Sequence, residues 1–284
     1  MKKDTPQKVA RPFLKWVGGK AKLMPQLLPL IPDSYHDYYE PFLGGGAFYF
    51  ALPNVGNAYL NDINQHLIAS YVHVREDIEE IVAELKVVHN TFHSLLEEEQ
   101  KEYYLARRTE YNELNDSNIR KTSLLIFLNK TCFNGIYREN RKGYFNVPFN
   151  RSKNPPILDE PNLRLVSTKI ANAKFSSGSY TELVKSAKKG DFIYFDPPYH
   201  PLNATSSFTS YHADNFSAAD QEELRDTFTE LDKRGCYVML SNSASEFIQE
   251  LYKDFRQEEL LAARSINSVG AARGKIKELV ILNY

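Results

Sequence analysis

The sequence is poor in cysteine and has no long apolar run. Its two cysteines, Cys132 and Cys236, lie far apart and match no metal-binding or redox spacing. We therefore expect reduced thiols in a protein core. No apolar stretch approaches the ~20 residues that a membrane-spanning helix needs, and the N-terminus does not resemble a signal peptide. These absences predict a soluble protein that is not exported, has no membrane partner and has no cysteine-bound metal.

Two common enzyme motifs are also missing. The segment that ends in Lys20 lacks the first glycine of a phosphate-binding loop, and Ala21 follows where serine or threonine is needed. His89 and His93 are four residues apart, but Asn90 stands where a zinc protease has its glutamate. The sequence thus disfavours a nucleoside triphosphatase and a zinc enzyme, and we predict no metal site.

Charge is nearly balanced but unevenly distributed. The net charge of −1 by itself argues against nucleic acid as a partner. Basic residues nevertheless dominate residues 1–22 and 130–153, whereas acidic residues concentrate in 76–102. The basic residues of the second segment are Lys130, Arg138, Arg141, Lys142, Arg151 and Lys153. Such segregation allows a basic face on a neutral protein.

A glycine-rich turn between two short strands predicts a nucleoside pocket. The first strand ends at Glu40, and Gly44 opens a run of three glycines that lets a ligand approach the backbone. Tyr49 stands where a dinucleotide fingerprint needs a small residue, so that fingerprint is incomplete. A second strand ends in Asp62, 18 residues after Gly44, and an acid there can accept hydrogen bonds from ribose hydroxyls.

The segment Asp196-Pro197-Pro198-Tyr199 follows a mostly apolar strand, 191–195. In an open α/β sheet, ligands bind beyond the carboxyl ends of such strands. The prolines stiffen the corner, and Pro197 keeps Asp196 out of the helical region. The Asp196 carboxylate and the Pro197 carbonyl can hold the two N–H bonds of a nucleobase amine, so that its nitrogen attacks an electrophilic methyl group. Tyr199 can stack on a base extracted from a duplex.

The order of elements predicts an α/β protein with a doubly wound, Rossmann-like sheet. Residues 63–128 follow a helical pattern, and strands and helices alternate from 159 onward. The expected helices are 159–172, 180–188, 217–234 and 244–253, and the expected strands are 173–178, 191–195, 236–242, 255–262 and 276–283. We predict a catalytic domain, 1–64 and 159–284, that is interrupted by an inserted domain, 65–158.

Residues 133–149 of the insert are predicted to form a β-hairpin with its turn near Lys142-Gly143. Arginine, asparagine, proline and aromatic side chains occur together in it. A two-stranded ribbon of this kind fits the major groove of DNA.

Together these segments resemble the DNA adenine methyltransferase (Dam) family, in which the cofactor motif precedes the recognition insert and the catalytic motif follows. The matching pieces are Lys15-Trp16-Val17-Gly18-Gly19-Lys20, Glu40-Pro41-Phe42-Leu43-Gly44-Gly45-Gly46, Asn61-Asp62, Phe133-Asn134-Gly135-Ile136-Tyr137-Arg138, Phe145-Asn146-Val147-Pro148-Phe149, Asp196-Pro197-Pro198-Tyr199 and Phe208-Thr209-Ser210-Tyr211. Their order and spacing hold over nearly the whole chain.

The resemblance implies a methyltransferase that uses S-adenosylmethionine to methylate the N6 amine of a flipped adenine in GATC, within double-stranded DNA. The residues expected at the cofactor are Trp16, Lys20, Glu40, Phe42, Gly44, Asp62 and Asp196. Asp196, Pro197 and Tyr199 are expected to act on the adenine. The residues expected at the DNA are Lys15 at the outer base pair, Arg138 at a guanine, Phe133, Asn134, Ile136 and Pro148 in the groove or the gap, and Arg151.

The chain departs from the family pattern at Asn150 and Ser152, which stand where glycine and tyrosine are usual. That tyrosine takes part in recognising the outer base pair in relatives. Three alternatives stay open: a cytosine-N4 methyltransferase that uses the same corner, an inactive DNA-binding protein, and a dehydrogenase. For the leading reading we expect a monomer or weak dimer, associated with DNA in the cytoplasm of a bacterium or encoded by a phage.

Overall fold

The computed structural model describes residues 9–53, 55–152, 154–202, 216–263 and 275–284. Several segments discussed above lie outside these residues. They are part of the basic N-terminal segment, Lys153, the segment Phe208–Tyr211 that matches the family, and most of the two polar stretches 200–211 and 265–275. The described chain divides into two compact units, and each is treated separately. The first comprises Met1–Gly19, Gly44–Phe50 and Asn64–Asn172, and the second Lys20–Leu43, Ala51–Ile63 and Ala173–Tyr284. The predicted domain bounds, 1–64 with 159–284 around 65–158, stay a prediction.

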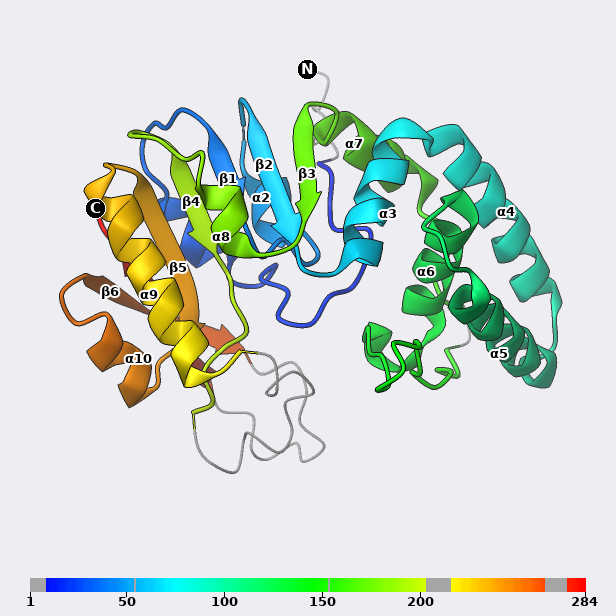
Figure 1. Ribbon diagram of the computed structural model, residues 1–284. Coiled ribbons are helices and arrows are strands. Elements are labelled where there is room, and N and C mark those ends of the chain that lie inside the picture. Colours follow the sequence, from blue (N-terminus) through cyan, green and yellow to red (C-terminus); the bar gives the residue numbers. More distant parts are fainter. Residues whose placement is uncertain (1–8, 54, 153, 203–215, 264–274) are drawn as a thin grey trace, which may run out of the picture. The chain divides into compact units, whose positions relative to one another are not determined.

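The second unit is built on a seven-stranded sheet (Figure 1). Its strands are β1 (Tyr38–Glu40), β2 (Ala58–Asp62), β3 (Ala173–Ser177), β4 (Phe192–Phe195), β5 (Tyr237–Ser243), β6 (Arg256–Ala263) and β7 (Lys275–Leu282). Their order is β3-β2-β1-β4-β5-β7-β6, and β7 runs antiparallel to both of its neighbours. The α/β class and the strands expected from the sequence are thereby confirmed.

The strand order reverses between β1 and β4. From β1 the chain proceeds outward to β2 and β3, and it returns on the other side of β1 to form β4 and β5. The crevice at the carboxyl ends of two such strands is the usual ligand site of an open α/β sheet. Glu40 is the last residue of β1, and Asp196 directly follows β4. The fold therefore brings these two acids to the same edge of the sheet.

Helices α8 (Tyr180–Val184), α9 (Ala218–Lys233) and α10 (Glu246–Leu251) pack their apolar side chains on one face of this sheet. In Figure 1, α9 lies in front of β5, α8 lies to its right beside β4, and α10 lies below it. Ser217 begins α9 with a capping box, in which its hydroxyl accepts from the Asp220 N–H and the Asp220 carboxylate accepts from the Ser217 N–H. Strand β4 is fully buried, as its apolar run predicted. The other short helical segments of the unit are α1 (Met24–Leu27) and the 3-10 helix η1 (Leu28–Leu30).

The first unit is helical, as the pattern over 63–128 predicted. Its helices are α2 (Ala47–Ala51, whose last residue belongs to the second unit), α3 (Gln65–Glu76), α4 (Ile78–Ser94), α5 (Glu97–Glu113), α6 (Ile119–Thr131), the 3-10 helix η2 (Phe133–Gly135) and α7 (Glu160–Lys169). Side chains of Asn64, Asn118 and Asp159 cap α3, α6 and α7 by accepting a backbone N–H of the first turn. Nearly all of α6 is buried, which makes it the central helix of this unit.

The hairpin predicted over 133–149 is only partly formed. The chain does reverse at 140–144, and two antiparallel bridges join Cys132 to Phe149 and Glu139 to Phe145. Regular strands are absent from this described segment, because η2 occupies its start and Asn134 adopts a left-handed φ of 57°. Instead of a regular ribbon, residues 132–149 form an irregular loop, which we call the recognition loop after the role that the family resemblance predicts for it.

Candidate active site

The corner after β4 contains a buried ion pair. Lys20 Nζ lies 2.8 Å from Asp196 Oδ1, and the two side chains are only 6% and 19% exposed. Burial raises the pKa of Asp196 above its usual range, and the adjacent Lys20 ammonium opposes that rise. The same ammonium lies 4.7 Å from the centre of the Tyr199 ring. Three residues that the sequence assigned to one site are thus in contact.

The backbone of the corner is held by hydrogen bonds from α9 and β5. Gln221 Nε2 donates to the Pro198 carbonyl over 2.9 Å, and Asn242 Nδ2 donates to Gln221 Oε1 over 3.0 Å. The His200 N–H donates to Asn242 Oδ1, and the Ser243 hydroxyl donates to the His200 carbonyl. Because Gln221 and Asn242 are fully buried, these contacts are shielded from water. They keep the corner rigid, and Pro197 inside it is buried as well.

Sequence reasoning missed these supporting residues. Asn242 gave a weak signal, since a polar residue ends an otherwise apolar strand, whereas Gln221 looked like any polar residue of an amphipathic helix. It also missed Glu278 on β7, whose Oε2 accepts a 2.8 Å hydrogen bond from the Tyr199 hydroxyl. The pKa of Tyr199 is raised well above its usual range, mainly by burial and further by the charges of Asp196 and Glu278. The phenol therefore stays protonated.

Glu40 and Phe42 lie at the carboxyl end of β1. Glu40 is buried, and its Oε2 accepts a 2.6 Å hydrogen bond from the Tyr38 hydroxyl. Phe42 is partly buried and packs against Tyr180 and Phe195, with ring centres 5.2 and 6.3 Å away. The acid and the aromatic ring next to it are therefore both fixed in place.

Asp62 ends β2, where its carbonyl accepts the Gly178 N–H and its side chain is partly exposed. The adjacent Asn61 is buried and donates its amide hydrogens to the carbonyls of Pro41 and Gly178. These bonds join the segment after β1 to the ends of β2 and β3. Asn61 therefore has a structural role in the Asn61-Asp62 pair, and Asp62 lies at the sheet edge.

Trp16 and Gly44, which were also predicted at the cofactor, are in contact within the first unit. Gly44 has a left-handed φ of 50°, and a Cβ there would lie 2.9 Å from Trp16 Cδ1. The Tyr71 hydroxyl donates to the Gly44 carbonyl over 3.0 Å. The indole also stacks on Tyr137, with ring centres 5.2 Å apart and an interplanar angle of 22°. The predicted cofactor tryptophan therefore contacts the recognition loop.

Gly44→Ala is expected to destabilise the protein more than Gly143→Ala. Both glycines have left-handed backbones, which cost an alanine about 1–2 kcal/mol, but a Cβ at Gly143 meets nothing within 4 Å. The difference in the free energy of unfolding isolates the clash with Trp16. Trp16 is the only tryptophan, so its fluorescence should change in Gly44→Ala alone. Equal stabilities and unchanged emission from both variants would contradict this packing.

The recognition loop is bound to Lys15 through Asn129. The Lys15 N–H donates to Asn129 Oδ1 over 2.8 Å, and Asn129 Nδ2 donates to the carbonyls of Lys15 and Gly135. The structure thus places the Lys15 backbone next to the start of the loop. Asn129, buried within α6, was not identified from the sequence because its position there looks like that of a core residue.

Arg138 lies in the recognition loop, is partly exposed and is held by Asn146. Its Nε donates to Asn146 Oδ1 over 2.7 Å, and its Nη2 donates to the Asn146 carbonyl over 3.3 Å. Of the other predicted DNA residues, Phe133, Asn134 and Pro148 are exposed and Ile136 is partly exposed. Arg151, three residues beyond Pro148, is 74% exposed and lies 3.9 Å from Glu97. The predicted DNA residues of the loop thus leave side-chain surface accessible.

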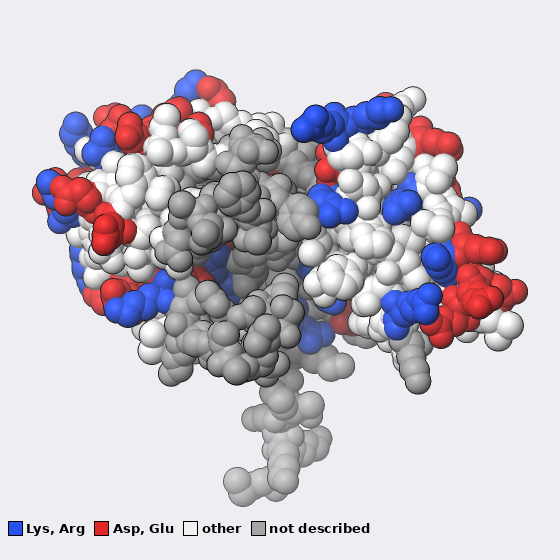
Figure 2. Space-filling view, turned by 90° about the horizontal axis from the view of Figure 1, so that it is seen from below, with Lys and Arg blue, Asp and Glu red and all other residues white. Residues whose placement is uncertain are grey.

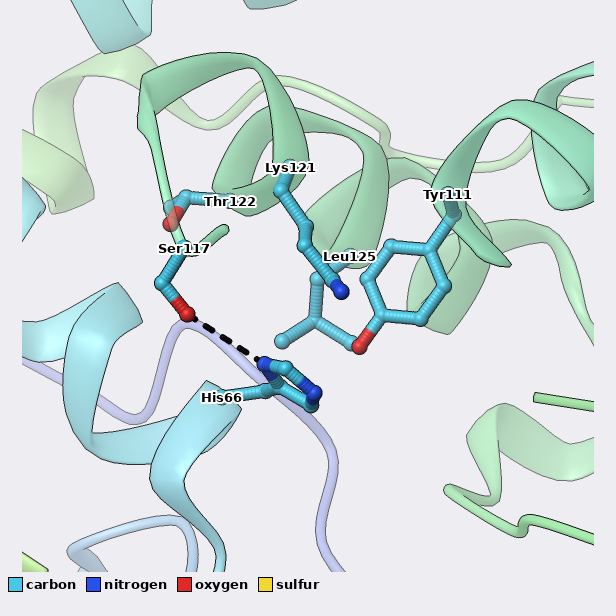
Figure 3. Close-up of a pocket in the computed structure, with 6 residues that line it drawn as sticks. All are labelled: His66, Tyr111, Ser117, Lys121, Thr122 and Leu125. Carbon is cyan, nitrogen blue, oxygen red and sulfur yellow. Dashed lines mark hydrogen bonds between the residues drawn. The ribbon is translucent and has the colours of Figure 1, made fainter. Parts of the chain in front are cut away.

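A polar pocket within the first unit supports this loop (Figure 3). Figure 3 shows the His66 ring next to Ser117, with Lys121 and Tyr111 directed toward the same space. The Lys121 ammonium lies 5.0 Å from the centre of the Tyr111 ring, and the Tyr111 hydroxyl is 3.4 Å from the Tyr137 hydroxyl. Tyr137 in turn donates to Glu139. This cluster therefore anchors the underside of the recognition loop.

On the face shown in Figure 2, lysine and arginine side chains form several separate clusters, and acidic side chains gather in others. In the recognition loop Arg141 and Lys142 are exposed.

Within the described residues no three histidine, cysteine or carboxylate side chains come together as metal ligands. His89 and His93 contact each other on α4, with ring centres 4.4 Å apart. None of the described helices is both long and apolar enough to cross a bilayer.

Comparison with known proteins identifies the family. Residues 16–266 match the model of the D12 class N6 adenine-specific DNA methyltransferases. The chain is 42% identical to the type II methyltransferase M1.LlaDCHI of Lactococcus lactis subsp. cremoris, an alignment that covers 96% of this chain and 95% of the relative. It is also 42% identical to the type II methyltransferase M.MjaIII of Methanocaldococcus jannaschii, with 96% and 99% covered. A DNA adenine methylase of Vibrio cholerae is 35% identical, with 97% and 96% covered. The chain therefore belongs to the D12 class of N6 adenine-specific DNA methyltransferases.

Proposed function

We propose that this enzyme transfers a methyl group from S-adenosylmethionine to the N6 amine of an adenine that is flipped out of GATC in double-stranded DNA. The observation that carries the proposal is the Asp196-Pro197-Pro198-Tyr199 corner, which lies beside the strand reversal and is held rigid by buried hydrogen bonds. Family membership fixes the reaction as adenine methylation of DNA. The methyl donor, the residue roles and the target sequence are the proposed parts.

The chemistry requires a rigid pair of acceptors. The lone pair of the adenine amine is delocalised into the ring, so the nitrogen is a poor nucleophile. The Asp196 carboxylate and the Pro197 carbonyl accept hydrogen bonds from the two N–H groups of the amine and draw its nitrogen toward tetrahedral geometry. Tyr199 stacks on the extruded base and offsets part of the few kcal/mol that flipping costs. Because the corner is fixed before the substrate arrives, orientation supplies much of the rate acceleration.

The residues at the sheet edge suit the proposed cofactor. When bound, S-adenosylmethionine supplies an electrophilic methyl group on a positively charged sulfur. Glu40, Asp62 and Asp196 are carboxylates at the ends of three neighbouring strands, and such groups accept hydrogen bonds from ribose hydroxyls and attract positive charge. Phe42 offers an apolar surface beside them. We also assign Lys20 to this site, and we assign Trp16 and Gly44 of the first unit to the same cofactor.

The recognition loop provides residues for reading and opening the duplex. We assign Arg138 to a guanine, since a guanidinium held by Asn146 is oriented for a bidentate contact. Phe133, Asn134, Ile136 and Pro148 are assigned to the groove or to the gap left by the adenine. Lys15 is assigned to the outer base pair and Arg151 to DNA. The GATC target rests on the resemblance of the loop sequence to the Dam family.

Methyl transfer to a panel of duplexes tests the proposal. With labelled S-adenosylmethionine, a GATC duplex should accept methyl groups, whereas each of its single-base variants should react more slowly. The DNA is then digested to nucleosides, and the label should be found in N6-methyladenine. Label in N4-methylcytosine, or equal transfer to GATC and to every variant, would refute the assignment. Variants of the first base are the most informative, because Asn150 and Ser152 depart from the family pattern.

A further inference from the structure

We propose that Glu278 is a positioning residue for methyl transfer, which fixes the Tyr199 ring against which the flipped base stacks and contributes a second negative charge beside Asp196. This inference rests on the proposed function of the corner. Glu278 belongs to none of the sequence motifs discussed above, and it lies in the last strand of the chain, 79 residues after Tyr199.

The antiparallel course of β7 places Glu278 at the active edge. Strand β7 pairs with β5, and Glu278 lies opposite Ser243, the last residue of β5. Since β5 is parallel to β4, its end lies at the same sheet edge as Asp196. Because β7 runs antiparallel to its neighbours, Glu278, which lies in the first half of β7, is placed at the edge where the parallel strands end.

The contact leaves the Tyr199 ring little freedom. Its hydroxyl donates to Glu278 Oε2 over 2.8 Å, and the Lys20 ammonium lies 4.7 Å from its ring centre. One contact holds the tip of the ring and the other lies over one of its faces, so together they fix the plane against which a base would stack. A carboxylate acceptor makes the hydrogen bond to the phenol charge-assisted and therefore stronger than a neutral one.

Glu278 also acts on the electrostatics of Asp196. Among the described residues, Lys20, Glu278, Tyr194 and Tyr199 interact electrostatically with Asp196. The Glu278 carboxylate raises the pKa of Asp196, whereas the Lys20 ammonium lowers it. Replacing Glu278 by a neutral residue should therefore lower the pKa of Asp196. The carboxylate that accepts the amine would then persist to lower pH.

The test compares Glu278→Ala with Glu278→Gln in the full-length enzyme. With enzyme in excess over a GATC duplex, Glu278→Ala should lower the single-turnover rate constant about 10-fold, because the partly buried phenol loses its acceptor. Glu278→Gln should stay within about 3-fold of the wild type, because an amide oxygen still accepts from a hydroxyl. The dissociation constant for DNA should not change. Glu259→Ala, which removes a half-exposed glutamate of β6, is the matched control.

Two further measurements separate positioning from a merely structural role. In Glu278→Gln the acid limb of the pH profile should move to lower pH. In a Tyr199→Phe background, Glu278→Ala should cause no additional loss, because the hydroxyl that it accepts is already gone. If Glu278→Ala does not fold, the pH profile of Glu278→Gln still tests the inference.

Wild-type rates in Glu278→Ala, or an unmoved acid limb in Glu278→Gln, would overturn the inference. The wild-type enzyme is measured first. If it forms no N6-methyladenine on GATC, the proposed function fails, whereas a methylating wild type with an indifferent Glu278 refutes this inference alone.

Discussion

Replacing Asp196 by alanine is expected to lower the methyl transfer rate by at least about 10³-fold, which corresponds to roughly 4 kcal/mol of activation free energy. The variant loses the carboxylate that accepts an N–H of the adenine amine, and it leaves the buried Lys20 ammonium without its 2.8 Å partner. Alignment of reacting groups alone can supply about 7–11 kcal/mol, so a misplaced amine accounts for a loss of this size.

The fold and the DNA affinity of Asp196→Ala should be largely kept. The corner retains its bonds from Gln221 and Asn242, and the residues assigned to DNA in the recognition loop are unchanged in this variant. Circular dichroism and DNA binding at fixed salt check these points. Asp226→Ala, on the exposed side of α9, is the matched control and should methylate normally. Turnover close to that of the wild type in Asp196→Ala would remove Asp196 from the mechanism.

The pH profile of the wild type follows from the same carboxylate. Asp196 has to be ionised to accept a hydrogen bond from the amine while it forms an ion pair with Lys20. Burial raises the pKa of Asp196 above the usual aspartate range. Activity should therefore fall as the pH decreases through this raised pKa. The loss should begin at a higher pH than the protonation of an exposed aspartate would cause. Within the same reasoning, Lys20→Met removes the group that lowers this pKa and should move the acid limb to higher pH, opposite to Glu278→Gln.

Local sequence patterns predicted the sheet and the corner because both depend on neighbours in the chain. An apolar run such as Phe192–Phe195 has to be buried on both faces, and the prolines after it fix the backbone wherever the segment lies. The Asp196, Pro197 and Tyr199 cluster follows from that. The link to Lys20 came only from the family resemblance, since 176 residues separate it from Asp196 and no pattern within one segment encodes that contact.

The residues that escaped prediction are those whose role is created by packing. Glu278, Gln221 and Asn129 are polar residues in ordinary-looking strands and helices, and only the register of the sheet or the seating of a helix gives them a partner. The predicted hairpin forms only in part for a related reason. Its aromatic and β-branched composition suits strands, but a left-handed Asn134 and the anchoring of Tyr137 and Phe145 in the helical unit override regular pairing.

Arg138→Ala is expected to reduce discrimination at one base pair of the target by about 1–3 kcal/mol, or roughly 5- to 150-fold, if the guanidinium contacts a guanine bidentately. The Nε–Oδ1 bond to Asn146 leaves the side chain oriented before DNA binds. The measurement is kcat/KM on GATC and on duplexes changed at single positions. Selectivity should fall at one position only and stay unchanged at the other three.

Lys142→Ala is the matched control for Arg138→Ala, because Lys142 lies in the exposed turn of the same loop. A lysine that contacts phosphate reads no sequence, so this variant should weaken binding equally on all duplexes and reduce the salt dependence by about one phosphate contact. Uniform weakening by Arg138→Ala would instead make Arg138 a phosphate contact.

Because Asn146 orients the guanidinium, Asn146→Ala should reproduce part of the Arg138→Ala loss at the same base pair. An effect at a different position would contradict the assigned geometry.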